Sequence, residues 1–199
     1  MAENKIELLK EHHPLEPFLP GNARMLMLGS FPPPRERWTM NFYYPNFQND
    51  MWRIFGIVFF DNKNHFIAQN GKVFNESDIR DFLTSKGIAL FDTAVEVIRH
   101  KGNASDQFLE IVKPADLKTL LSQIPHCKTI VTTGQKATDT LMMILKVNNT
   151  PPVCGYIHAS YGGRKLICYR MPSSSRAYPK ALTDKSLDYK RMFEAIGLL

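Results

Sequence analysis

Short apolar runs alternate with longer amphipathic segments along the chain. An apolar run of five or so residues that ends at turn residues is typical of a strand buried on both faces, whereas a longer segment with one apolar side predicts a helix. The pattern predicts strands over residues 24–30, 88–92, 127–132 and 165–171, and helices over residues 49–60, 75–85, 114–124, 136–145 and 184–196. Strands that alternate with helices favour an α/β fold, with a parallel sheet covered on both faces.

Several predicted helices carry residues that commonly mark helix ends. Asn75, followed by Asp78 in the first turn, is a typical N-cap, and Gly87 is placed to end the same helix. Pro114 suits the first turn of the next helix. These signals place the predicted helices between the predicted strands.

The composition is that of an ordinary globular protein, with 199 residues, 44% hydrophobic and 22% charged. No repeat or low-complexity linker divides the chain, so we expect one domain over residues 1–199, with a core over about 24–196. The apolar runs are too short to span a membrane, and the N-terminus lacks an apolar signal core. Three cysteines without a CxxC pair argue against a structural zinc site or an iron–sulfur cluster. A cytoplasmic protein is predicted.

Positive charge is concentrated near the C-terminus. The net charge is +6, and residues 164–191 alone hold eight basic side chains against two acids. The remainder of the chain is therefore neutral overall. Such a local excess favours a polyanionic partner, with nucleic acid first, although a solvated basic face fits the charge equally well.

Ligands of parallel sheets bind beyond the carboxyl ends of the strands. Four loops leave those ends, after Ser30, Asp92, Thr133 and Pro172. Asp92 could be functional there or could cap the loop that follows. The six histidines are scattered and show no metal-ligand spacing.

The first of these loops, residues 29–52, combines prolines, aromatic residues and asparagines. A stiff loop of this kind could hold a planar heterocycle by stacking and by amide hydrogen bonds. Packing of Phe42, Tyr43 and Trp52 in the core is the plainer alternative.

The last loop has three consecutive serines, Ser173 to Ser175, followed by Arg176 and Lys180. Hydroxyls, backbone amides and cations suit a phosphate group, although a serine-rich turn is also common. Gly134 and Lys136 open a predicted helix, where free N–H groups favour an anion.

Four segments, GSFPPP, FYYPNFQNDMW, GIALFDT and MPSSSRAY, occur in an order that resembles the uracil-DNA glycosylase superfamily, and most closely its hypoxanthine-DNA glycosylase branch. The resemblance runs from about Arg24 to Ile196. It implies a three-layer α/β/α domain around a four-stranded parallel sheet. Phe47 and Met51 depart from the branch's pattern, which leaves the choice of base open.

The resemblance implies hydrolysis of the N-glycosidic bond of a deaminated base, uracil or hypoxanthine, in DNA. It implies a monofunctional, monomeric enzyme without metal or redox cofactor. Such an enzyme must extrude the base into a pocket and brace the gap that it leaves. The reaction also needs donors at the base and a positioned water at the sugar carbon.

Residue roles follow from the same resemblance. Many superfamily members position water with a polar residue where this chain has Phe31, so an asparagine further along the loop takes that role, Asn46 first and Asn49 second. The implied base pocket comprises Ser30, Phe31, Tyr44, Asp92 and Ser173. The implied DNA contacts are Gly134, Lys136, Ser174, Ser175, Arg176, Tyr178 and Lys180, with Arg176 to Tyr178 as the wedge.

Two other functions remain open from the sequence. Phe31 in the water-positioning slot favours a non-catalytic nucleic-acid-binding protein with the same fold. A hydrolase of free nucleosides or nucleotides could use the same pocket, but it has no need of the basic segment 164–191.

Overall fold

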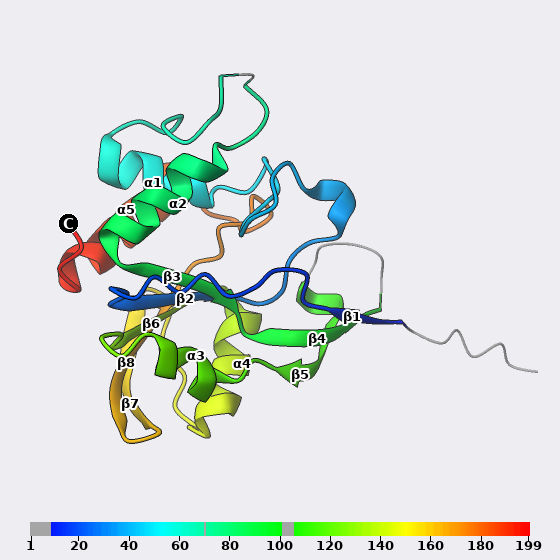
Figure 1. Cartoon of the computed structure of the whole chain (residues 1–199), viewed down its shortest axis with the longest axis vertical. Helices are drawn as coiled ribbons and strands as arrows, with labels where there is room; N and C mark the ends of the chain where they lie inside the picture. The colour runs from blue at the N-terminus through cyan, green and yellow to red at the C-terminus, as the bar shows by residue number, and fades with distance from the viewer. Residues whose placement is uncertain (1–8, 70, 101–105) are drawn as a thin grey trace, which may run out of the picture.

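The four apolar runs predicted as strands lie side by side in one sheet (Figure 1). They form β2 (Met25–Gly29), β3 (Ile88–Asp92), β6 (Thr129–Thr133) and β8 (Arg164–Met171), which run parallel in the order β3-β2-β6-β8. Every residue of β2, β3 and β6 is buried, and burial on both faces explains the apolar runs of β2 and β3; β6 has buried threonines around Ile130 and Val131. The structure, a computed structural model, describes residues 9–69, 71–100 and 106–199.

A fifth strand, β7 (Gly155–Tyr161), pairs antiparallel with β8 at the edge of this sheet. The prediction of a four-stranded parallel sheet is therefore wrong, because the sheet is five-stranded and mixed. The residues of β7 alternate between half-buried and exposed positions, so it shows no apolar run. Its best sequence signal is Gly162-Gly163, whose positive φ angles of 55° and 79° form the tight turn into β8.

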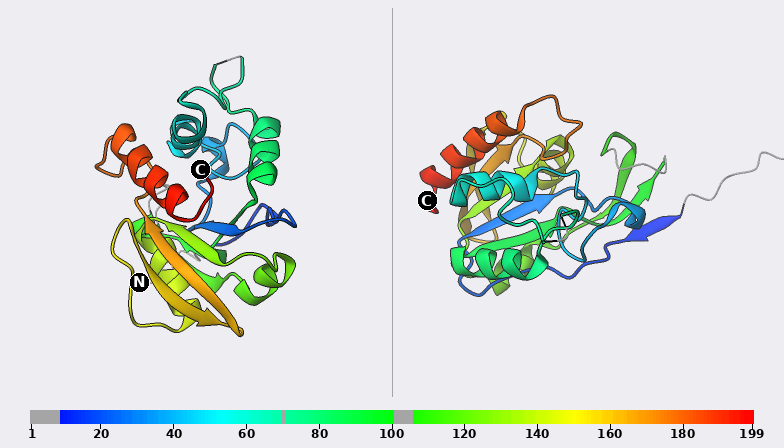
Figure 2. Two further views of the ribbon diagram at one scale, coloured as in Figure 1. Left: turned by 90° about the vertical axis from the view of Figure 1, so that its left-hand side faces the viewer. Right: turned by 90° about the horizontal axis from the view of Figure 1, so that it is seen from above.

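Helices cover both faces of the sheet, as the alternating pattern predicts (Figures 1 and 2). One face carries α1 (Met51–Phe60), α2 (Glu76–Lys86) and α5 (Leu182–Ala195), and the other carries α3 (Leu117–Gln123) and α4 (Gln135–Leu145).

The predicted ends of α2 are confirmed, whereas the predicted start of α3 is not. Asn75 Oδ1 accepts the N–H of Asp78, and Gly87 closes α2 with a φ of 68°. The start of α3 is wrong by three residues, because Pro114 ends a strand and Asp116 is the cap.

A second, smaller sheet that the pattern does not predict lies beside the carboxyl end of β3. It consists of β1 (Lys10–His12), β4 (Ala94–Arg99) and β5 (Leu109–Pro114), all antiparallel, in the order β1-β4-β5. Only Thr93 separates β3 from β4, so this sheet starts where the first one ends. Two short 3-10 helices, η1 (Arg35–Arg37) and η2 (Asp106–Phe108), lie in the loops.

Buried aromatic residues anchor the first loop to the core. Phe42, Tyr43 and Trp52 are each 3% exposed or less, and Trp52 Nε1–H donates to the carbonyl oxygen of Tyr43 at 3.1 Å. The core-packing alternative therefore holds for these three side chains. Phe42 and Tyr43 lie in the loop and Trp52 lies in α1, so their burial fixes the path of the loop up to the start of α1.

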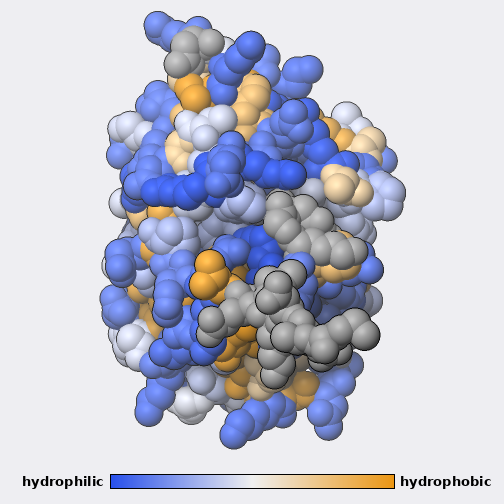
Figure 3. All heavy atoms as spheres, turned by 90° about the vertical axis from the view of Figure 1, so that its right-hand side faces the viewer, coloured by the Kyte–Doolittle hydropathy of each residue, from blue (hydrophilic) through white to orange (hydrophobic). Residues whose placement is uncertain are grey.

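The surface beyond the carboxyl ends of the strands is mostly hydrophilic, with separate hydrophobic spots (Figure 3). Among the described residues, none of the helices combines the length and apolar character that crossing a membrane requires.

Replacing Gly87 by Ala should lower the free energy of unfolding by about 1 to 3 kcal/mol, because the positive φ strains an L residue. The added Cβ would also lie 2.7 Å from the backbone oxygen of Asn22. Gly21→Ala is the matched control, since its Cβ would have nothing within 4 Å. Urea unfolding of both variants measures the difference, and equal midpoints would refute the assignment.

Candidate functional site

The four loops that leave the parallel strands converge on one cavity of about 640 Å³. Ser30 follows β2, Asp92 ends β3, Thr133 ends β6 and Ser173 follows β8, and all four line it. The cavity therefore lies at the carboxyl edge of the sheet, where the sequence places the chemistry.

Most residues named from the sequence line this cavity. They are Ser30, Phe31, Tyr44, Asn46, Asn49, Asp92, Ser173, Ser174, Ser175, Arg176 and Tyr178. Gly134, Lys136 and Lys180 do not line it. Gly134 packs behind Ser173, where an added Cβ would lie 3.4 Å from the Ser173 Cβ atom. Lys180 instead forms an ion pair with Asp188 of α5.

Close packing at the end of β2 shapes the floor of the cavity. A Cβ atom at Gly29 would overlap with Asp92 Oδ1, so only glycine leaves room for this carboxylate. Tyr44 has a φ of 51°, in the left-handed region, and its hydroxyl lies 3.1 Å from Thr133 Oγ1. Backbone strain of this kind gathers at functional sites. Burial, followed by the charge of Asp92, raises the pKa of Tyr44, so the phenol stays neutral and can donate.

His13, which no pattern in the sequence marks as a site residue, lies directly behind Asp92. Its Nε2 is 2.9 Å from Asp92 Oδ2, and the two side chains are 3% and 9% exposed. Its Nδ1 lies near the backbone N and O of Leu15, which fixes the ring plane. His13 follows β1, and the pairing of β1 with β4 brings this N-terminal segment to the cavity.

Asp106, at the start of η2, is a second residue that sequence reasoning missed. Ser30 Oγ–H donates to Asp106 Oδ1 at 2.8 Å, across 76 residues of sequence. Burial raises the pKa of Asp106, the Ser30 hydrogen bond opposes that shift, and the charge of Asp92 adds to it. A carboxylate thus reaches the first loop from the second sheet.

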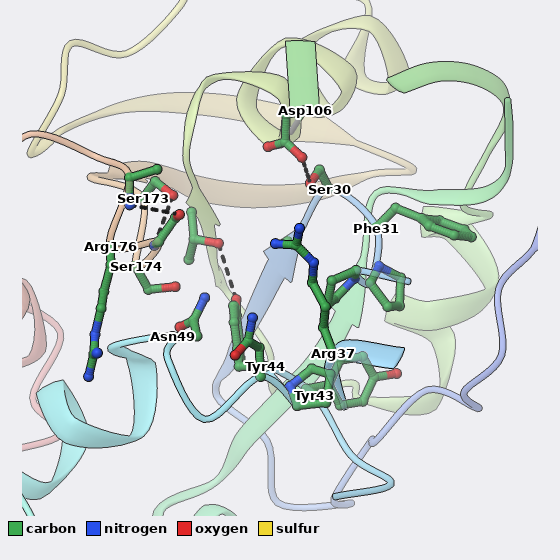
Figure 4. A pocket seen from close by; sticks show the side chains of 18 of the residues that line it. Ser30, Phe31, Arg37, Tyr43, Tyr44, Asn49, Asp106, Ser173, Ser174 and Arg176 are labelled. Carbon is green, nitrogen blue, oxygen red and sulfur yellow. Dashed lines mark hydrogen bonds between the residues drawn. The ribbon is translucent and has the colours of Figure 1, made fainter. Parts of the chain in front are cut away.

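Both candidate asparagines use their side-chain oxygens to shape the first loop. Asn46 Oδ1 accepts the N–H of Gln48, and Asn49 Oδ1 accepts the N–H of Met51, each at 2.9 Å. Within the described residues, neither Nδ2 group has a hydrogen-bond partner, so both are available to donate. Figure 4 shows the Asn49 side chain between Tyr44 and Ser174.

The serine loop is held by its own side chains. Ser173 Oγ accepts the N–H of Ser175, and Ser175 Oγ accepts the N–H of Ala177, both at 3.2 Å. Ser174 is buried, whereas Arg176 is exposed on the rim, with a side chain that is 51% accessible. The loop therefore presents hydroxyls inside the cavity and a cation at its edge.

Asp50 joins the first loop to the serine loop and to α5. Its N–H donates to the oxygen of Ser174 at 3.0 Å, and its carboxylate pairs with Lys185 at 3.1 Å and Arg176 at 3.2 Å. Lys185 is fully buried and also donates to the oxygen of Ser175 at 2.8 Å. These contacts set the distance between the two loops that line the cavity.

The basic segment 164–191 does not form one surface. Arg164, at the start of β8, binds backbone oxygens at the end of α3, and Arg170 binds Gln135. Lys185 is buried, as described above. Of the cations named from this segment, Arg176 alone lines the cavity among the described residues.

The fold is similar to that of solved structures, although the sequence itself matches little. No family model matches the sequence, and no curated protein does. The chain is similar to the solution NMR structure of "a putative uracil DNA glycosylase" from Methanosarcina acetivorans, with a TM-score of 0.61 and 20% identity. The match covers 95% of this chain and 99% of the other. The chain therefore has a uracil-DNA-glycosylase-like fold.

Replacing Lys185 by Met should destabilise the protein by about 3 to 5 kcal/mol, because the buried Asp50 loses its buried partner. Lys190→Met, at an exposed position of the same helix, is the control and should unfold like the wild type. Denaturant unfolding gives the comparison. A Lys185→Met midpoint equal to that of the control would contradict the structural role of the pair.

Proposed function

We propose that this protein is a DNA glycosylase of the uracil-DNA glycosylase superfamily that removes a deaminated base, uracil or hypoxanthine, from DNA. The observation that carries the proposal is the single cavity lined by both the first loop and the serine loop. Their sequences resemble the superfamily's first and last motifs, and the similar fold of the Methanosarcina protein supports the same reading.

The cavity has the groups that such a reaction needs. Tyr44 and Phe31 provide aromatic walls for a flat base, while the amide groups of Asn46 and Asn49 can hold its edge or a water molecule. Positive charge develops on the sugar as the glycosidic bond breaks, and Asp92 lies at the cavity floor to stabilise it. No cofactor is required for this hydrolysis.

The rim of the cavity suits the backbone of a DNA substrate that is bound by a single copy of the protein. Ser173 and Ser175 can bind a flanking phosphate, and Arg176 and Tyr178 border the opening, where a wedge would enter the gap left by the extruded base. Lys136 and Lys180 lie outside the cavity lining and remain candidates for phosphates farther along the strand.

The direct test incubates excess protein with labelled duplexes that hold one uracil, hypoxanthine or xanthine, followed by alkali. Alkali-sensitive cleavage at uracil or hypoxanthine supports the proposal. Undamaged duplex is the control. Salt-sensitive DNA binding without base release would instead favour the non-catalytic binding protein, for which Phe31 in the water-positioning slot is the supporting observation.

Asn46→Ala should abolish most base release while DNA binding is kept, and Asn49→Ala should do so if the second asparagine carries the role. Loss of one such donor lowers turnover by roughly 10²- to 10³-fold. Asn149→Ala, an exposed amide outside the cavity lining, is the control. Single-turnover rates and binding titrations measure the two effects. Wild-type turnover in both cavity variants would remove the asparagines from the mechanism.

A further inference from the structure

Hydrolysis of a glycosidic bond requires an acceptor for the proton of the attacking water. An asparagine amide can orient water but is not a base, and Phe31 is apolar. Among the described residues that line the cavity, the carboxylates are Asp92 and Asp106. Asp92 and Asp106 are therefore the carboxylates of the described lining that could accept this proton.

Asp92 is the more enclosed of the two carboxylates, since it is buried whereas Asp106 is only partly buried. Its Oδ2 is 2.9 Å from His13 Nε2, and its Oδ1 fills the space over Gly29. The side chain is only 9% exposed. It can stabilise positive charge from where it lies, but it exposes less of its side chain to a water in the cavity than the partly buried Asp106 does.

One carboxylate oxygen of Asp106 accepts a hydrogen bond from the protein, and the other does not. Oδ1 accepts the Ser30 hydroxyl proton at 2.8 Å, whereas Oδ2 has no hydrogen-bond partner among the described residues. No fully buried side-chain polar atom of the described chain lacks a partner, so Oδ2 is reached by solvent. One hydrogen bond orients the carboxylate, and a water molecule can bind the other side.

The position of Asp106 complements that of the amides. Figure 4 shows the Asp106–Ser30 hydrogen bond on one side of the cavity, with Asn49 and Ser174 on the other. Ser30 directly precedes Phe31, so its hydrogen bond brings a carboxylate from η2 next to the position where the first loop has an apolar side chain.

We propose that Asp106, oriented by Ser30, is the general base of the site. This assignment rests on the glycosidase function proposed above. The bond between C1′ and the base nitrogen breaks, and its electron pair leaves with the base. The water oxygen bonds to C1′ and gives a proton to Asp106 Oδ2, which then returns that proton to the departing base.

The surroundings of Asp106 act on its pKa in both directions. Burial and Asp92 raise its pKa, whereas Lys136 of α4 and Arg99 of β4 lower it. The side chain of Arg37 extends toward Ser30 across the same cavity (Figure 4). A general base is active when ionised, so base release should fall as the pH drops through the pKa of Asp106.

Asp106→Asn keeps the shape of the side chain and removes the base. It should lower the single-turnover rate by roughly 10²- to 10⁴-fold on whichever duplex, uracil or hypoxanthine, the wild type cleaves. Affinity for that duplex should stay within about threefold, and the acidic limb of the pH–rate profile should disappear. Asp81→Asn, the same change at an exposed position of α2, is the control and should act as the wild type.

Ser30→Ala provides a second readout that a structural role alone would not give. Its hydroxyl lowers the pKa of Asp106, so its loss should move the acidic limb to higher pH. Wild-type rate and pH profile in Asp106→Asn would overturn the assignment and leave the proposed function standing. If the acidic limb of Ser30→Ala lay at the same pH as that of the wild type, this result would also count against the assignment. Absence of base release by the wild type would overturn the proposed function itself, and this assignment with it.

Discussion

The buried contact of Asp50 with Lys185 holds the candidate site together. Two segments separated by more than a hundred residues must meet with the accuracy of a hydrogen bond for the cavity to exist. A buried charge without its partner is strongly unfavourable, so the pair permits few relative positions of the first loop and α5. The N–H of Asp50 and the amine of Lys185 each bind a serine-loop oxygen, which extends the constraint to the third segment.

The carboxyl edge of the five-stranded sheet is the second element that positions the site. Strands β2, β3 and β6 are buried throughout, and their carboxyl ends place Ser30, Asp92 and Thr133 at fixed positions. The small sheet adds His13 and Asp106 from outside this layer. A site whose polar groups are held by packing before substrate binds has less to reorganise during the reaction, which is a major source of catalysis.

What the sequence could predict depends on how locally each feature is determined. Short, mostly apolar segments that end at turn residues mark β2, β3, β6 and β8, so these strands were predictable, and α2 shows its caps at Asn75 and Gly87. The strands β4 and β7 are half-buried and mix polar with apolar residues, so their pattern resembles that of a loop. The start of α3 was misplaced because Pro114 suits a strand end as well as a helix start.

The same distinction holds within the site. Residues near the ends of apolar strands, such as Ser30, Asp92 and Ser173, could be named because the topology of a parallel sheet places them at one edge. His13 and Asp106 reach the site by pairing with residues 79 and 76 positions away, which no local pattern shows. Lys185 belongs to a basic segment that suggests an exposed surface, yet burial turns it into a structural ion pair.

The most direct measurement is the single-turnover release of base from a duplex with one uracil or one hypoxanthine, with excess wild-type protein. We expect an alkali-sensitive abasic site at one of these bases and none in the undamaged duplex. Intact strands from both damaged duplexes, under conditions where the protein binds them, would contradict the proposed activity.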